Sequence, residues 1–381
     1  MLIGVPKEIK NHEYRVGLTP ESVAELTHLG HRVLVETQAG AGIGDSDNDY
    51  RDAGAEIAND ARVVFDAAEM IVKVKEPQAG ERAMLRRDQI LFTYLHLAPD
   101  PEQPRDLLAS GAICIAYETV TDATGALPLL KPMSQVAGRM AIQAGATALE
   151  KAHGGRGVLL GGVPGVQPAK VVILGGGVVG FHAAENAVGL QADVTILDKN
   201  PLALERLASH FGAKARVLYS NKASIAEHVA NADLVIGAVL IPGASAPKLV
   251  TRAMLATMKT GAVLVDVAID QGGCFETSHA TTHAEPTYVV DGIVHYCVAN
   301  MPGGVARTST YALNNATLPH VTRLANLGWK EALRADPHLR AGLSIWNGKV
   351  TCAPVAQVQG YEFVSPETAL ASQEEAQRLA S

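Results

Sequence analysis

The chain has 381 residues, of which 48% are hydrophobic and 4% aromatic, and its formal net charge is −7. This length predicts two domains, and an acidic chain without a basic stripe is not expected to bind nucleic acid. The apolar runs are too short to cross a membrane, and Lys7 places a charge where a signal peptide would be apolar. Because the four cysteines lack metal-type spacing, we expect a cytoplasmic protein with reduced cysteines and no metal.

The first 130 residues alternate short apolar runs with segments of helical period. Thr19 before Pro20 predicts the N-cap of a helix over 20–29, and a long helix of small residues is predicted over 134–152. Strands that alternate with helices indicate a parallel, doubly wound sheet. The predicted strands are 2–5, 32–36, 70–74, 90–95 and 112–116.

The second half repeats this alternation and then returns to helix. A helix is predicted from about 307 to 327, and the polar end of the chain has too little apolar material to form a domain, so we expect it to pack on the first one. We therefore predict a discontinuous substrate domain, 1–130 with 307–381, and a dinucleotide-binding domain, 131–306, with a connecting helix. The strands predicted in the second domain are 171–174, 193–197, 215–218, 233–237, 262–267 and a pair within 288–298.

A glycine-rich turn follows the first strand of the second domain. The run VVILGGGVVG at 171–180 fits GxGxxG: Gly175 allows a tight turn, Gly177 a close approach of backbone to pyrophosphate, and Gly180 close packing of helix on strand. Val178 and Val179 would begin a helix whose N-terminus faces the phosphates. Asp198 ends the next strand, where it would bind the ribose hydroxyls and favour NAD over NADP. A glycine-rich turn that binds nothing is the alternative.

Ionisable and amide side chains follow several of the predicted strands. Lys75, His96, Asp270 and Asn300 stand just beyond strand ends, and Arg15 lies in the loop after the first strand. Ligands bind at the carboxyl ends of parallel strands, so we expect Arg15, Lys75 and Asn300 to bind a small carboxylate substrate. His96 and Asp270 are the candidates for moving protons. Each residue alone could instead be an ordinary turn or surface residue.

Long motifs resemble the alanine dehydrogenase and nicotinamide nucleotide transhydrogenase family. Similarity extends over nearly the whole chain, and the later motifs are similar to those of its alanine dehydrogenase members. The motifs are GVPKEIKNHEYRVGLTPESVAELTHLGH at 4–31, LHLAPD at 95–100, KPMSQVAGRMAIQAGA at 131–146, GGRGVLLGGVPGV at 154–166, DVAIDQGGCFE at 266–276 and YCVANMPGGVARTST at 296–310.

The resemblance implies two Rossmann-like domains with a cleft between them, a hexamer, and reversible NAD-dependent oxidative deamination of L-alanine. It implies that Arg15 and Lys75 bind the substrate carboxylate and keto oxygen, with His96 as acid/base and Asp270 as the second catalytic residue. Ala203 and His279 depart from the basic residues that relatives often have there. The residues implied to contact NAD are Ser134, Val178, Asp198, Ser220, Val239, Leu240 and the segments 267–270 and 298–301, with Val267, Ala268, Ile269, Val298 and Met301.

Three other functions remain open. The NAD(H)-binding component of a proton-translocating transhydrogenase has the same fold but no use for His96 and Asp270. A related dehydrogenase of a larger amino acid would need a larger pocket, against which Tyr94, Met133 and Met301 argue. A non-catalytic NAD-binding protein is the third. Formation of NADH from L-alanine and NAD⁺ separates all of them from an alanine dehydrogenase.

Overall fold

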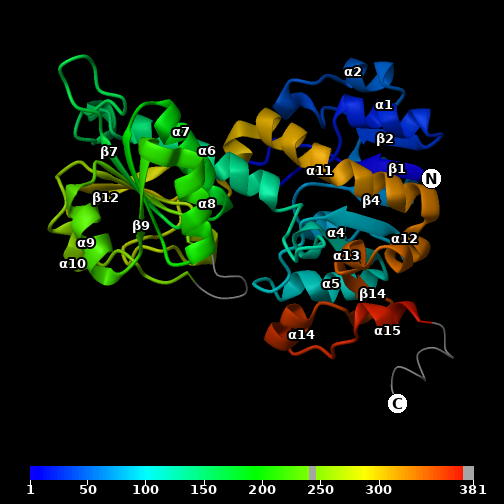
Figure 1. Cartoon of the computed structure of the whole chain (residues 1–381). Helices are drawn as coiled ribbons and strands as arrows, with labels where there is room; N and C mark the ends of the chain where they lie inside the picture. Colours follow the sequence, from blue (N-terminus) through cyan, green and yellow to red (C-terminus); the bar gives the residue numbers. More distant parts are fainter. Residues whose placement is uncertain (240–245, 372–381) are drawn as a thin grey trace. The chain divides into compact units, whose positions relative to one another are not determined.

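A computed structural model describes residues 1–239 and 246–371 (Figure 1). The chain divides into two compact units: Met1–Met133 with the segment that begins at Val305, and Ser134–Gly304. Each unit is a Rossmann-like α/β unit, so the predicted fold class is confirmed. Within the described ranges, no helix is long and apolar enough to cross a membrane.

The first unit is built on an eight-stranded sheet with the order β15-β14-β6-β5-β4-β1-β2-β3. Strands β1 to β6 run parallel to one another, whereas β14 is antiparallel to both β6 and β15. The segment from Val305 to residue 371 belongs to the same unit, and it adds β14 and β15 to the sheet beside β6. The strands are β1 (Leu2–Val5), β2 (Arg32–Glu36), β3 (Glu56–Ala58), β4 (Met70–Val72), β5 (Ile90–Thr93), β6 (Ile113–Ala116), β14 (Leu343–Trp346) and β15 (Lys349–Val350).

Helices cover both faces of this sheet, and alternate strand residues feed two apolar cores. Ile90 and Phe92 of β5 belong to one core and Leu91 to the other. Thr19 caps the first helix as predicted, because its Oγ1 accepts from the amide of Ser22 at 3.3 Å. The helices are α1 (Pro20–His28), α2 (Asp47–Asp52), α3 (Ala61–Ala67), α4 (Ala79–Arg82), α5 (Glu102–Ser110), α11 (Ala306–Leu327), α12 (Trp329–Ala335), α13 (Pro337–Arg340), α14 (Ala353–Gln359) and α15 (Pro366–Leu370).

The second unit has a seven-stranded sheet with the order β12-β13-β11-β10-β7-β8-β9, parallel except for the β12–β13 hairpin. The strand predictions for this unit hold to within one or two residues, and the pair predicted within 288–298 is the β12–β13 hairpin. The strands are β7 (Lys170–Leu174), β8 (Asp193–Asp198), β9 (Ala215–Tyr219), β10 (Leu234–Gly237), β11 (Val263–Asp266), β12 (Thr287–Val290) and β13 (Ile293–Tyr296), and the helices are α7 (Val178–Gly189), α8 (Pro201–Phe211), α9 (Lys222–Asn231) and α10 (Arg252–Leu255).

The long helix predicted over 134–152 is α6 (Lys131–Ala148), so both predicted ends were wrong. It begins earlier because proline is favoured in the first turn of a helix, where its missing N–H costs nothing, and Pro132 occupies that turn. It ends earlier because the chain tightens into a 3-10 turn at Lys151–His153, which Gly154 terminates in the left-handed conformation.

Two predicted strands also end earlier than expected, and one physical cause accounts for both. The runs 70–74 and 90–95 stop as regular strands at Val72 and Thr93. Beyond β4, Glu8 accepts from the amides of Val74 and Lys75 at 2.7 and 3.2 Å. Beyond β5, Glu118 accepts from the amides of Leu95 and His96. A carboxylate thus replaces the neighbouring strand as acceptor.

The strand order creates a reversal point in each sheet. In the first unit the chain fills one side of β1 with β2 and β3 and then crosses to the other side with β4. In the second unit it fills one side of β7 with β8 and β9 and then crosses to β10. Open parallel sheets bind ligands at the carboxyl ends of the strands that flank such a reversal.

A buried lysine that contacts two carboxylates directly follows β4. Lys73 Nζ contacts Glu8 Oε2 at 3.0 Å and Glu81 Oε1 at 2.6 Å, and none of the three side chains is more than 2% exposed. Burial raises the pKa of Glu8, although the Lys73 charge opposes this shift. The lysine therefore compensates two acids that would otherwise be costly to ionise in the core.

Replacing this lysine tests the arrangement. We expect Lys73→Met to lower the free energy of unfolding by about 3–5 kcal/mol near neutral pH, because two buried carboxylates lose their partner. Since the pKa of Glu8 is raised in the folded state, it takes up a proton as the pH falls. The deficit should therefore shrink in acid and grow as the pH rises through that pKa.

Urea unfolding at two pH values measures this effect. Arg32→Met is the control, because the Arg32–Glu56 pair is mostly exposed at 67% and 56% and should contribute less than about 1 kcal/mol. Equal and small deficits in the two variants would contradict the prediction.

Candidate functional site

Three of the sequence-predicted site residues lie at the carboxyl edge of the first unit's sheet. Arg15 is in the loop between β1 and α1, Lys75 lies three residues beyond β4, and His96 three residues beyond β5. Strands β5, β4 and β1 are consecutive neighbours, and the reversal point lies between β1 and β4. The structure therefore gathers these three side chains where a parallel sheet binds its ligand.

Arg15 is a buried guanidinium aligned by a buried acid. Its Nε and Nη2 donate to the two carboxylate oxygens of Glu13 at 2.6 and 2.5 Å, and its Nη1 contacts Met133 Sδ at 3.0 Å. Burial opposes the charge, but the hydrogen bonds and charge of Glu13 outweigh it and raise the pKa of Arg15. The two-point contact fixes the plane of the guanidinium, which suits it to orient a second carboxylate.

Lys75 is half-buried beside this arginine. Burial, followed by the Arg15 and Lys10 charges, lowers the pKa of Lys75, while the neighbouring Glu76 carboxylate partly offsets the shift. Its backbone amide is held by Glu8. The positive charge of such a lysine is disfavoured in the free site. It is stabilised when the lysine binds a substrate oxygen that carries negative charge.

His96 is exposed and has an uncommon backbone conformation. Its φ is +49°, a left-handed value that costs a non-glycine residue on the order of 1 kcal/mol or more. Its amide donates to Glu118 Oε1 at 2.6 Å, and such a bond to a charged acceptor contributes about 1.5–3 kcal/mol. The bond is thus strong enough to offset the strain. The imidazole stacks on Tyr94, with ring centroids 5.7 Å apart and an interplanar angle of 12°.

In the second unit the glycine-rich turn lies at the carboxyl ends of β7 and β10. Gly175 has φ +100°, and a Cβ there would lie 2.7 Å from the carbonyl oxygen of Ala238 beside β10. A Cβ on Gly180 would collide with the carbonyl oxygen of Gly175, whereas Gly177, the N-cap of α7, faces open space. Backbone atoms thus crowd the turn at Gly175 and Gly180, while the space beside Gly177 at the helix N-terminus is open, as a bound pyrophosphate requires.

Asp198 ends β8 beside this turn. Its two carboxylate oxygens accept from the amides of Gly176 at 2.5 Å and Asn200 at 2.7 Å. Arg206 of α8 donates to the carbonyl oxygen of Gly176 at 2.8 Å, a brace that sequence reasoning missed. A carboxylate keeps acceptor capacity beyond two hydrogen bonds, so these residues fit the ribose and pyrophosphate of NAD.

Asp270 lies in a 3-10 turn, Ile269–Gln271, just beyond β11. The loop is folded by Asp266, a fully buried acid whose Oδ1 accepts from the amides of Ala268 and Cys274, both at 3.2 Å. Asp270 itself is exposed. The sequence missed Asp266, because its position as the last residue of a strand resembles that of any strand terminus.

The other predicted residues of the second unit also follow its strands. Asn300 has φ +59°, and its carbonyl oxygen lies 3.2 Å from His283 Nε2. Leu240 lies outside the described residues, and Ser134 is in α6. Among the departures, the His279 ring stacks on Tyr288 at 3.6 Å, and Ala203 lies in the first turn of α8. Ser220 follows β9, Val239 follows β10, Val267, Ala268 and Ile269 follow β11, and Val298 and Met301 follow β13.

The predicted groups thus fall into two sets, Arg15, Lys75 and His96 in the first unit and Asp270 and Asn300 in the second. The cleft that would join the two sets stays a prediction. No group of three or more histidine, cysteine or acidic side chains within 1–239 and 246–371 could hold a metal ion. His295 is buried, and its Nε2 lies 2.7 Å from Thr277 Oγ1.

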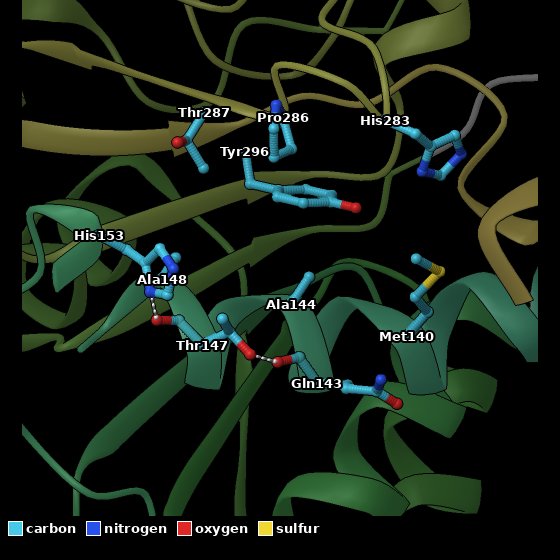
Figure 2. A pocket seen from close by; sticks show the side chains of 10 residues that line it. All are labelled: Met140, Gln143, Ala144, Thr147, Ala148, His153, His283, Pro286, Thr287 and Tyr296. Atoms are coloured by element: carbon cyan, nitrogen blue, oxygen red, sulfur yellow. Dashed lines mark hydrogen bonds between the residues drawn. The ribbon is translucent and has the colours of Figure 1, made fainter. Parts of the chain in front are cut away.

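A hollow of about 260 Å³ lies between α6 and the β12–β13 hairpin (Figure 2). Figure 2 shows the Tyr296 ring between the hairpin and α6, with His153 and His283 towards opposite ends. None of the predicted site residues lines the hollow, and it is small for a dinucleotide. It is lined by Met140, Gln143, Ala144, Thr147, Ala148, His153, His283, Pro286, Thr287 and Tyr296.

The glycine turn yields a matched pair of substitutions. We expect Gly180→Ala to weaken NADH binding by ~10-fold or more, because the new Cβ displaces the Gly175 carbonyl and opens the turn. Gly189→Ala is the control in the same helix, where a Cβ meets nothing within 4 Å. NADH fluorescence titration measures both dissociation constants. Equal affinity of the two variants would show that close packing at position 180 is not needed for binding.

The chain matches two family models over most of its length. The model described as "Alanine dehydrogenase/PNT, N-terminal domain" matches residues 4–137, and "Alanine dehydrogenase/PNT, C-terminal domain" matches residues 141–353. The alanine dehydrogenase of Halomonas elongata is 60% identical over 364 residues, covering 96% of this chain and 98% of that protein. That of Bacillus subtilis is 57% identical over 371 residues, with 97% and 98% covered.

Solved structures agree with these matches. An L-alanine dehydrogenase superposes with a TM-score of 0.92 at 53% identity, covering 97% of this chain and 100% of that one. A transhydrogenase from Sinorhizobium meliloti superposes with a TM-score of 0.79 at 28% identity, covering 92% and 98%. The chain therefore belongs to the alanine dehydrogenase/PNT family.

Proposed function

We propose that the protein is an NAD-dependent L-alanine dehydrogenase. It converts L-alanine, NAD⁺ and water into pyruvate, ammonium, NADH and a proton, and catalyses the reverse reaction. The observation that carries the proposal is the grouping of Arg15, Lys75 and His96 at one sheet edge, in a chain whose other unit has a dinucleotide turn. Relatives at 53–60% identity that are named alanine dehydrogenase support the choice of substrate.

The first unit's residues bind and orient the amino acid. Arg15, held flat by Glu13, receives the substrate carboxylate, and Lys75 stabilises negative charge on the oxygen of the carbonyl or carbinolamine. Fixing these two points orients the Cα–H bond. Asp198, Gly175, Gly177 and the start of α7 would hold NAD, which when bound would supply the acceptor for that hydrogen as hydride.

His96 and Asp270 move the protons. The substrate ammonium must lose a proton before its nitrogen lone pair can expel the hydride, and water must then be deprotonated to add to the imine. An imidazole can accept and donate a proton, so it can do both, and transfer of this kind typically accelerates a reaction by ~10²–10⁴-fold. Asp270 is the second acid/base group.

The nearest alternative is the NAD(H)-binding component of a transhydrogenase. The solved transhydrogenase is 28% identical to this chain, against 53% for the solved L-alanine dehydrogenase. A component that exchanges hydride between nucleotides needs no amino-acid site. The buried Arg15–Glu13 pair beside Lys75 favours the dehydrogenase.

The decisive assay is NADH formation, followed by absorbance, from L-alanine and NAD⁺ at mildly alkaline pH. We expect the unmodified chain to be active, and His96→Ala and Asp270→Ala each to lose more than ~100-fold in kcat, while NADH binding by fluorescence is nearly unchanged. An unmodified chain that binds NADH but forms none from L-alanine would favour the transhydrogenase or a non-catalytic NAD-binding protein.

The lowered pKa of Lys75 predicts a pH dependence of substrate affinity. The ammonium form binds the keto oxygen, so KM for pyruvate should rise as the pH increases through this pKa, below the range of an ordinary lysine. Lys75→Arg should move the rise to higher pH, because a guanidinium keeps its charge. Lys7→Arg, at an exposed position, is the control. A KM that stays flat in the unmodified chain through that alkaline range contradicts this role.

We further propose that the enzyme works in the cytoplasm as a homohexamer with no membrane or nucleic-acid partner. Resemblance to the family supports the hexamer, as do three exposed apolar residues of the second unit: Leu159, Val163 and Val166 are 66%, 54% and 62% exposed. Light scattering should give a mass near six times 40.0 kDa. A mass of one copy would rule the hexamer out.

A further inference from the structure

Side chains from two other elements of the first unit hydrogen-bond to the backbone of the loop that carries His96. Glu118 lies in the 3-10 turn Tyr117–Thr119 after β6, and Gln103 lies in the first turn of α5. We infer that Glu118 and Gln103 are positioning residues that fix His96 for proton transfer. The inference rests on the proposed function and adds two residues to the machinery of the reaction.

Glu118 holds the amide side of the loop. Its carboxylate accepts from the amide of His96 at 2.6 Å and, through both oxygens, from the amide of Leu95 at 3.1 Å. Two successive amides can point at one carboxylate only if the backbone between them turns sharply. The turn is made at Leu95, and His96, whose amide is the second of the two, follows it with φ +49°.

Gln103 holds the carbonyl side of the same peptide. Its Nε2 donates to the carbonyl oxygen of Leu95, so Leu95 is held at both its amide and its carbonyl. Gln103 is fully buried, and its Oε1 has no hydrogen-bond partner among the described residues. Burying an amide group whose oxygen accepts no hydrogen bond costs free energy, which a leucine or methionine at this position would avoid. What the glutamine supplies and those residues could not is the hydrogen bond to the Leu95 carbonyl.

The grip matters because the left-handed backbone sets the direction of the imidazole. Without Glu118, His96 can relax to negative φ, which swings its Cα–Cβ bond and removes the ring from its stack on Tyr94. Arg15 and Lys75 are held by other acids, Glu13 and Glu8. Loss of Glu118 should therefore misplace the proton carrier and leave the substrate-binding groups in place.

Two substitutions at Glu118 test this separation, with Glu69→Gln as the matched control. Glu69 also accepts from a backbone amide, that of Leu2 at 2.6 Å, but at the opposite, amino end of the same sheet. We expect kcat for L-alanine to fall by ~10–100-fold in Glu118→Ala and less in Glu118→Gln, which retains one acceptor oxygen. KM for L-alanine and the Kd of NADH should change by less than about threefold. Glu69→Gln should keep kcat.

The solvent isotope effect separates misplacement of His96 from a general loss of structure. If proton transfer becomes slower, the ratio of kcat in water to kcat in deuterium oxide should rise in Glu118→Gln and in Gln103→Met, but not in Glu69→Gln. Thermal unfolding verifies that the variants are folded. If Glu118→Ala does not fold, Glu118→Gln alone is used for the test.

The outcomes distinguish this inference from the proposed function. An unmodified chain that forms no NADH from L-alanine overturns both. An active unmodified chain in which the folded Glu118 variants keep their kcat, or lose it with an unchanged solvent isotope effect, overturns the positioning role alone.

Discussion

The site depends on one repeated interaction, a carboxylate that takes over backbone amides where a parallel strand stops. A strand that leaves the sheet loses the carbonyl acceptors of its neighbour, and its amides must find others. Glu8 supplies them beyond β4, Glu118 beyond β5 and Asp266 beyond β11, while Asp198 accepts from the turn beyond β7. In each case the chain turns out of the sheet at a defined residue, and a candidate functional group lies within a few positions of the turn.

These acids also set the charge of the site. Glu13 keeps Arg15 ionised in surroundings that burial would make costly, and Glu8 belongs to the pair of acids around Lys73. Lys75 is the exception, because burial and its cationic neighbours leave its charge opposed. Arg15 thus has an acid that balances its charge, whereas the charge of Lys75 is poorly balanced. A sheet edge with these two cations favours an anionic ligand whose oxygens reach both.

The sequence was sufficient for the fold class and for placing the candidate site residues just beyond strand ends, but it did not predict β3, β14 and β15 of the first sheet. Apolar runs located the other strands, and the glycine spacing with Asp198 located the turn, because both signals are local. The braces were not predictable, since Glu118 acts on residues more than twenty positions away and Arg206 reaches Gly176 across a helix and a strand. The strand predictions over 70–74 and 90–95 were too long for the same reason, because the acids that end them are distant in sequence.

The return of the C-terminal segment to the first sheet has a consequence for the order in which the protein matures. Gln359, the last residue of α14, donates through Nε2 to the carbonyl oxygen of Ala98 at 2.6 Å, two residues beyond His96. The second unit ends at residue 304, so it can fold during synthesis before Gln359, the donor of this hydrogen bond, has been added to the chain. The His96 loop gains its full set of contacts only after more than fifty further residues have been synthesised.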